Sequence, residues 1–301
     1  MLIPVFIGAT LITFLIMTSV PGDPVLTMYG VNPTANPEYT AELRNKLGLD
    51  DPIPVQYAKF LWRLLHGDLG QSIISRRPVV VEIAEALPRT IILTITSMCI
   101  AIFIGIPVGI IAAVKQGSMV DNVSMVGALL AASLPNFWLA LVLIIIFSFN
   151  LRLTPVAGYG ELKHIVLPSL TLGVASAGLI ARFTRSSMLE VIRKDYITVA
   201  RSTGLRERTV LFKHALKNAL VPIVTVVGLE IGRLLGGAFF VEMIFAWPGI
   251  GRLSIQALQD RNYPVALGCI SVTATIFVII NLIVDILYAY IDPRIRYKKT
   301  G

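Results

Sequence analysis

The chain has 301 residues, of which 55% are hydrophobic and only 15% charged, and its mean hydropathy is +0.77. This composition excludes an ordinary soluble domain and indicates an integral membrane protein. The net charge of +8 could suggest nucleic-acid binding, but basic residues beside apolar spans more often mark loops that stay in the cytoplasm. Cys99 and Cys269 lie inside apolar runs, which favours two small buried residues over a disulfide.

Six membrane-spanning helices are predicted, and the fold class is therefore all-α. A helix needs about 20 apolar residues to cross the hydrocarbon core, so stretches nearly free of Asp, Glu, Lys and Arg mark the candidates. The first apolar run lacks the basic start and the small-residue cleavage site of a signal peptide, and we expect it to be retained. The predicted spans are 1–21, 89–114, 124–149, 165–187, 219–238 and 264–290.

The distribution of basic residues predicts the orientation of the chain. The segment between the fourth and fifth spans carries nine basic and three acidic residues, a net +6 of the chain's +8. The positive-inside rule places this segment in the cytoplasm. With an even number of spans, both termini, including the tail 292–301, are expected on the same side. The long segment 22–88 is then extracytoplasmic.

An amphipathic helix is predicted within that outer segment. In "VQYAKFLWRLLHGDLG", residues 55–70, aromatic residues and leucines recur at helical spacing with charged residues between them. Such a stripe fits packing on the membrane or on the spans. The alternative is a docking surface for an external partner.

Motifs for catalysis are missing from the sequence. The three histidines, His66, His164 and His214, fall on different loops, and neither H-E-x-x-H nor G-x-S-x-G occurs. The phosphate-binding pattern G-x-x-x-x-G-K-[ST] is also missing. We therefore predict no catalytic residue, no metal site and no ATP bound by this chain, and a membrane enzyme is disfavoured.

The fifth predicted span contains two charged residues, Glu230 and Arg233, on one helical face. An ionisable residue in the middle of the bilayer costs about 2.5–3.5 kcal/mol on insertion scales, so such residues usually face inward, pair or function. One hypothesis is a self-neutralising structural pair, and the other is a pair that lines a translocation path. Gly228, Gly232 and Gly236 form a helix-packing ridge on nearly the opposite side.

The polar run "DYITVARSTGLRERTVLFKHALKNALVP", Asp195–Pro222, precedes this span. Its periodicity predicts a helix, a turn and a second helix, with Gly204 ending the first helix in a left-handed conformation. Small residues at the turn would let the hairpin enter a partner's groove, while the surrounding arginines keep it soluble and can meet acidic groups.

These motifs resemble those of a known family. "ARSTG" with the downstream "ALKNALVP" resembles the EAA loop of ABC-importer permeases, which docks into separate ATPase subunits. Over nearly the whole chain, further motifs resemble the B-type permease of the dipeptide/oligopeptide/nickel importer family. They are "VPGDP" (20–24), "LPNFWLAL" (134–141), "FAWPGIGR" (245–252), "RNYPV" (261–265) and "IDPRIRY" (291–297).

The resemblance implies a type I ABC importer permease fold in a bacterial or archaeal plasma membrane, the inner membrane in a Gram-negative source. Its implied partners are a second, C-type permease, two ATPases that bind ATP and magnesium, and an extracytoplasmic solute-binding protein, besides membrane lipid. The transmembrane domain is expected at 89–291, with a coupling loop at 189–218 and an outer gate region at 237–263.

Particular residues acquire roles through this resemblance. The expected ATPase-coupling residues are Tyr196, Ala200, Arg201, Ser202, Thr203, Gly204 and Leu205, and those of the outer gate are Glu242, Trp247, Pro248 and Gly249. An interfacial membrane anchor is the alternative for Trp247. Thr198 and Val199 depart from the general loop signature, which has Glu and Ala there.

Peptide import is the function that the resemblance favours. Glutathione and nickel chelates are alternative solutes of the same importer class. A secondary transporter is a more distant alternative, because it should show inverted repeats and paired interrupted spans, whereas only the fifth span is strongly interrupted.

Overall fold

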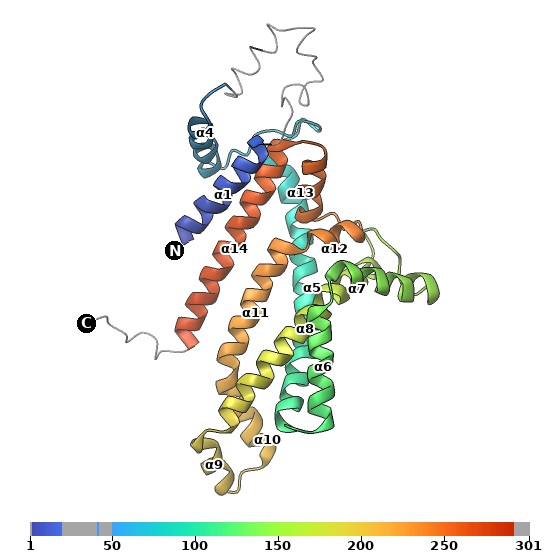
Figure 1. Ribbon diagram of the computed structural model, residues 1–301, viewed down its shortest axis with the longest axis vertical. Coiled ribbons are helices and arrows are strands. Elements are labelled where there is room, and N and C mark those ends of the chain that lie inside the picture. The colour runs from blue at the N-terminus through green and yellow to red at the C-terminus, as the bar shows by residue number, and fades with distance from the viewer. Residues whose placement is uncertain (1, 20–40, 42–49, 292–301) are drawn as a thin grey trace, which may run out of the picture. The chain divides into compact units, whose positions relative to one another are not determined.

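The computed structural model describes residues 2–19, 41 and 50–291 (Figure 1). Within these ranges every regular element is a helix, apart from one isolated antiparallel bridge between Gln71 and Pro78. The all-α prediction is confirmed. The motif at 20–24, much of the predicted outer segment and the tail 292–301 lie outside the described residues.

Among the described residues, four helical segments are long and apolar enough to cross a membrane. A fifth span results if the bent pair Met119–Ser133 and Asn136–Asn150 is counted as one. The first helix, α1 (Leu2–Ser19), is not among these segments, so the count of six spans stays a prediction. The four segments are Val79–Val114, Leu162–Ile192, Glu207–Gly236 and Tyr263–Val284.

The chain divides into two compact units, each with its own core. The first comprises Met1–Thr90 and Pro248–Val278. It contains α1, α4 (Ile53–Leu65), α13 (Ile250–Gln259) and the first parts of α5 (Val79–Val114) and α14 (Tyr263–Ile291). Its core consists of Val79, Ile83, Ala86, Ile250, Ala257, Val265, Ala266 and Cys269.

Helix α4 is the predicted amphipathic helix, and one side of it packs on α1. The Tyr57 hydroxyl lies 3.0 Å from the Thr10 hydroxyl, and the ring of Phe14 contacts those of Tyr57 and Phe60 at centroid distances of 5.5 and 5.8 Å. Trp62, on the same helix, is exposed. Packing on α1 therefore accounts for one side of α4.

The second unit comprises Ile91–Trp247 and Ile279–Gly301. Its core surrounds the long helix α8 and includes Leu93, Met98, Leu167, Leu172, Ile180, Leu234, Val241, Phe245 and Trp247. Its complete elements are α6 (Met119–Ser133), α7 (Asn136–Leu143), η1 (Ile144–Asn150), α8 (Leu162–Ile192), α9 (Asp195–Ser202), α10 (Glu207–Thr209), η2 (Val210–Leu216), α11 (Lys217–Gly237) and α12 (Phe239–Ile244).

Glycine allows α8 to lie very close to its neighbours. A Cβ atom added at Gly178 would lie 2.3 Å from the backbone oxygen of Ala128 on α6. One added at Gly109 on α5 would lie 2.5 Å from the backbone oxygen of Ala181 on α8. Because these neighbouring atoms are backbone, no side-chain movement can make room.

The third predicted span, 124–149, is broken near its middle. Helix α6 ends at Ser133, since Leu134 precedes Pro135 and is therefore biased away from helical backbone. The chain resumes as α7, and the two directions differ by 103°, as Figure 1 shows where α7 turns away from α6.

Candidate transport and coupling sites

The polar run between the fourth and fifth predicted spans forms a helical hairpin at the end of α8 (Figure 1). Only Arg193 and Lys194 separate α8 from α9. Helix α9 ends at Ser202, and Gly204 has a φ of 78°, the left-handed conformation that glycine adopts without strain. The returning arm runs through α10 and η2 directly into α11.

Polar contacts join the two arms of the hairpin. Arg201 donates two hydrogen bonds to the carboxylate of Glu207, from Nε at 3.2 Å and from Nη2 at 2.7 Å. These bonds raise the pKa of the Arg201 guanidinium above its usual value. Near the base, Asn218 donates to the Tyr196 hydroxyl at 2.9 Å.

An apolar cluster fixes the hairpin to the end of α8. It contains Met188, Val191, Ile197, Val210, Leu211, Ala215, Ala219 and Ile223, with Ala200 packed against it. By contrast, Val199 and Leu205 are 60% and 42% exposed. The hairpin therefore has a buried base, while two apolar side chains at and beside its tip are left largely uncovered by the rest of the described chain.

Glu230 and Arg233 form the ion pair expected from their spacing on α11. Arg233 donates to Glu230 from Nε at 2.9 Å and from Nη2 at 2.7 Å. Ser176 on α8 donates to the same carboxylate at 2.8 Å, and Nη2 of Arg233 lies 3.3 Å from the Ser176 hydroxyl. The Glu230 side chain is 7% exposed, whereas that of Arg233 is 49% exposed.

The glycine ridge of α11 faces elsewhere. A Cβ atom added at Gly228 would lie 2.3 Å from Cγ2 of Val284 on α14. Gly232 is buried and Gly236 half-buried. Helix α11 thus has a polar side toward Ser176 and a packing side toward α14.

The predicted outer-gate residues are divided between the two units. Glu242 and Trp247 are buried in the second unit, where the Trp247 N–H donates to the Glu242 carbonyl at 2.8 Å. The indole meets the Tyr159 ring edge-on at 4.9 Å. Burial in the protein core favours packing over a membrane-interface anchor for this tryptophan.

Pro248 and Gly249 belong to the first unit. The Pro248 carbonyl accepts a bond from Arg89 at 3.3 Å, and Gly249 immediately precedes α13. The Ile250 N–H then donates to the Thr90 hydroxyl at 2.9 Å. These side-chain contacts account for the irregular backbone after Trp247, which a membrane protein tolerates only against protein or a cavity.

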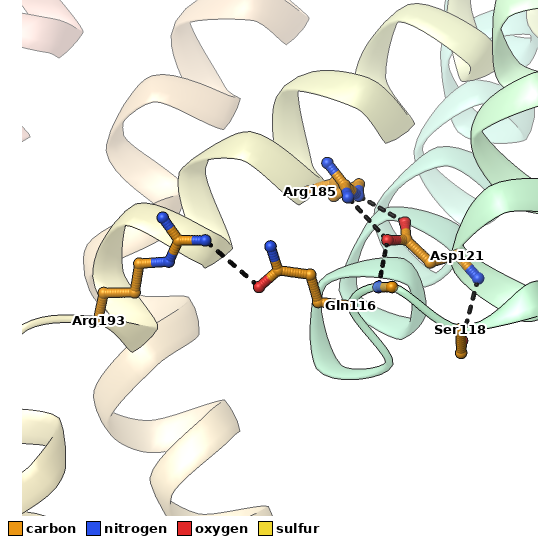
Figure 2. Close-up of polar contacts among 6 residues, drawn as sticks. Gln116, Ser118, Asp121, Arg185 and Arg193 are labelled. Carbon is orange, nitrogen blue, oxygen red and sulfur yellow. Dashed lines mark hydrogen bonds and ion pairs between the residues drawn. The ribbon is translucent and has the colours of Figure 1, made fainter.

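One polar site was not predicted: the pair Asp121 and Arg185 (Figure 2). Arg185 on α8 donates to both oxygens of Asp121 on α6, from Nε at 2.6 Å and from Nη2 at 2.7 Å. The Gly117 N–H donates to the same carboxylate at 3.0 Å, and the Asp121 N–H is capped by Ser118. The pattern "SMVD", a serine followed three residues later by an acid, signals this helix start in the sequence.

A second contact joins the same loop to α8. Arg193 donates to the side-chain oxygen of Gln116 at 3.4 Å, as Figure 2 shows beside the Asp121 pair. The first turn of α6 is therefore connected to α8 through Asp121 and Arg185, and the turn before it is connected to the C-terminal cap of α8 through Gln116 and Arg193.

The family models match almost the entire chain. Residues 105–297 match the model described as binding-protein-dependent transport system inner membrane component, and residues 1–94 match its N-terminal companion. The chain belongs to this family. It is a permease subunit of an ABC importer and a multi-pass protein of the plasma membrane, and such a permease works with ATPase and substrate-binding partners.

Its relatives are similar over nearly their full length. The dipeptide transport system permease protein DppB of Escherichia coli K12 is 43% identical, with 99% of this chain and 97% of the relative covered. DppB of Alkalihalophilus pseudofirmus is 45% identical over the same shares. The glutathione transport system permease protein GsiC of Salmonella typhimurium is 44% identical, with 99% and 96% covered.

Solved structures agree on the fold. An inward-facing structure of the MetNI methionine ABC transporter matches with a TM-score of 0.60 at 21% identity, covering 70% of this chain and 96% of that one. A chain of an amino acid ABC transporter matches with a TM-score of 0.52 at 17% identity, covering 78% and 98%. At these identities the likeness concerns the fold alone.

Proposed function

We propose that this chain is the B-type permease of an ATP-driven peptide importer and forms half of its translocation path, the other half coming from a C-type permease. The observation that carries this proposal is the similarity to dipeptide permeases of two bacteria across 99% of the chain. Glutathione, which GsiC's name specifies, is itself a peptide derivative. It remains the alternative solute, followed by a nickel chelate and, more distantly, by a secondary transporter with another energy source.

In this proposal, ATP and magnesium are bound by two partner ATPases and this chain binds no cofactor. Its own part is mechanical. The sequence lacks a phosphate-binding loop, but it offers a hairpin whose tip exposes the apolar side chain of Leu205. We assign docking on the ATPase to Tyr196 and to the tip Ala200–Leu205, which includes Arg201, Ser202, Thr203 and Gly204.

ATP-driven closure of the ATPases would move this hairpin. The permeases would then open outward, accept solute from the docked binding protein and return inward after hydrolysis. Such a cycle requires each ligand to favour one conformational state. The segment containing Glu242 and Trp247, with Pro248 and Gly249 following, is proposed as the outer gate.

Within the membrane, Arg233 is the proposed contact for solute. A half-exposed guanidinium in a span is costly against lipid, so a water-filled path or a partner subunit is its expected environment. Glu230 is shielded by Arg233 and Ser176 and serves to orient the guanidinium. The exposed cation fits the carboxylate terminus of a peptide.

The substrate is tested by ligand binding to the cognate solute-binding protein. Calorimetry with dipeptides, longer peptides, glutathione and a nickel chelate should give the highest affinity for a peptide. The same peptide should stimulate ATP hydrolysis by the complete complex. Preference for glutathione or nickel would move the assignment to that alternative, and a complex whose transport needs no ATP would contradict the importer proposal.

A further inference from the structure

The Asp121 carboxylate occupies a site with little room for water. Its side chain is 2% exposed, and its oxygens accept two bonds from Arg185 and one from the Gly117 backbone. A bidentate pair of this kind fixes direction as well as distance. Helix α8 is thereby held to the first turn of α6 in one orientation.

The contact between Gln116 and Arg193 lies further along α8. Arg185 and Arg193 are eight residues apart, which corresponds to about 12 Å along a helix. Two separated contacts resist rotation of one element against the other better than a single contact does. Figure 2 shows Arg193 reaching Gln116 in the turn between α5 and α6, and Arg185 reaching Asp121 in the first turn of α6.

The end of α8 is also the base of the coupling hairpin. Arg193 and Lys194 alone connect it to α9, and Met188 and Val191 share an apolar cluster with Ile197 of α9. Movement of the hairpin therefore has to displace the last turns of α8 or break this cluster.

The other side of the pair leads toward the proposed gate. Helix α6 continues to its break before Pro135, and α7 follows. Ala140 of α7 lies in the same core as Val241 and Trp247. A contiguous series of packed elements thus runs from the hairpin through α8, α6 and α7 to the Trp247 segment.

We propose that Asp121 and Arg185 are positioning residues that transmit hairpin movement to α6, and through α7 to the segment of Glu242 and Trp247. Neither residue contacts solute or ATP in this mechanism. The inference rests on the proposed function, because it assumes that the hairpin receives movement from an ATPase. It adds a second element, outside the hairpin, on which coupling depends.

The test is the number of solute molecules transported per ATP hydrolysed by the complete complex in vesicles with its binding protein. In Asp121→Asn we expect basal ATP hydrolysis to persist while the number of solute molecules transported per ATP falls at least about fivefold. About fivefold is the lower end of the effect that coupled sites in proteins usually have on one another. Arg185→Lys keeps the cation but loses the planar fork, so its ratio should lie between those of the wild type and Asp121→Asn. Copurification of the ATPases checks assembly of each variant.

Glu85→Gln is the matched control, because Glu85 forms an exposed pair with Arg77 and its loss should leave the ratio unchanged. The proposal is overturned if assembled Asp121→Asn and Arg185→Lys complexes keep the wild-type ratio. It is equally overturned if hydrolysis and transport fall in the same proportion, the result of a merely structural pair. Absence of solute-stimulated hydrolysis in the wild type would instead contradict the proposed function.

Discussion

At the scale of single residues, Glu230 and Arg233 show how one ion pair divides two roles. The carboxylate is buried and bonded by Ser176 and Arg233, while half of the guanidinium side chain remains exposed. Spacing alone predicts that the two residues meet but not that their exposures differ. The difference arises because Ser176 approaches from α8, a helix whose position is set by tertiary packing.

Removing Arg233 should destabilise the protein. Arg233→Ala leaves the Glu230 carboxylate buried without its cation, which costs about 3–5 kcal/mol in a fully buried pair. Because Arg233 is half-exposed, we expect about 1–3 kcal/mol here. Thermal unfolding of the purified protein measures the effect.

Two control variants distinguish loss of the Glu230–Arg233 ion pair from the mere removal of a charged side chain. Arg77→Ala removes an exposed partner of Glu85 and should leave the unfolding temperature nearly unchanged. Glu230→Gln combined with Arg233→Met removes both charges and should recover part of the lost stability. If Arg233→Ala lowered the stability no more than Arg77→Ala does, Glu230 would not be an unpaired buried charge in the Arg233→Ala variant.

At the scale of elements, the hairpin owes its form to local sequence and its place to packing. Gly204 permits the left-handed turn, and Ile197, Val210 and Leu211 bury its base. The tip keeps Leu205 exposed, so this apolar side chain is accessible to a partner.

Leu205→Asp should uncouple the importer without unfolding this chain. The side chain is exposed, so a carboxylate there costs little in the isolated subunit but opposes entry into an apolar groove. We expect copurified ATPase and solute-stimulated hydrolysis to fall at least about tenfold, or about 1.4 kcal/mol of docking energy. Leu205→Met is the control and should behave as wild type; full docking by Leu205→Asp would remove this tip from the interface.

The contact between α11 and α14 gives an independent test of helix packing. A Cβ atom at Gly228 would lie 2.3 Å from Val284, so Gly228→Ala should cost about 1–3 kcal/mol. Val284→Ala in the same chain should relieve much of that cost. Thermal unfolding compares both with Gly127→Ala, whose added methyl meets no atom within 4 Å and should be neutral or stabilising. A harmless Gly228→Ala would contradict the close approach.

Much of this architecture could be predicted from local signals. Apolar runs located the four clear spans, and Gly204 indicated the hairpin turn. The third span was predicted as one continuous helix over 124–149, which is wrong, because the chain bends by 103° between α6 and α7. Helix α5 begins earlier than the predicted span, at Val79, because Arg89 ends the charge-free window without ending the helix. A charged residue shows where the apolar stretch ends, but the helix can continue beyond it.

Contacts between distant segments could not be predicted. Asp121 and Arg185 are 64 positions apart on different helices, so no single periodicity brings them together. Ser118 and Asp121 do signal a helix start, but the cation that neutralises the acid depends on how α6 packs on α8. The same holds for Gly228. The spacing of small residues predicts that this side of α11 packs closely against another helix, but it does not predict that Val284 of α14 lies there.

At the scale of the whole molecule, the chain is a permease subunit of an ABC importer, and the proposed mechanism gives it a mechanical part. Its sequence lacks nucleotide-binding and catalytic motifs, and its family places the chain beside an ATPase and a substrate-binding protein. In this proposal the ion pairs of its second unit hold helices together, orient Arg233 toward solute and transmit movement of the hairpin. In the proposed mechanism energy enters from the partner ATPase, and ATP hydrolysis there drives peptide uptake through this chain.

Uptake of a labelled dipeptide by vesicles containing the complete complex tests that claim most directly. With the binding protein on one side and ATP on the other, we predict accumulation that stops when either is omitted and persists when ion gradients are dissipated. Omission of ATP with an ion gradient present should give no accumulation. Uptake that follows the ion gradient and ignores ATP would contradict the account.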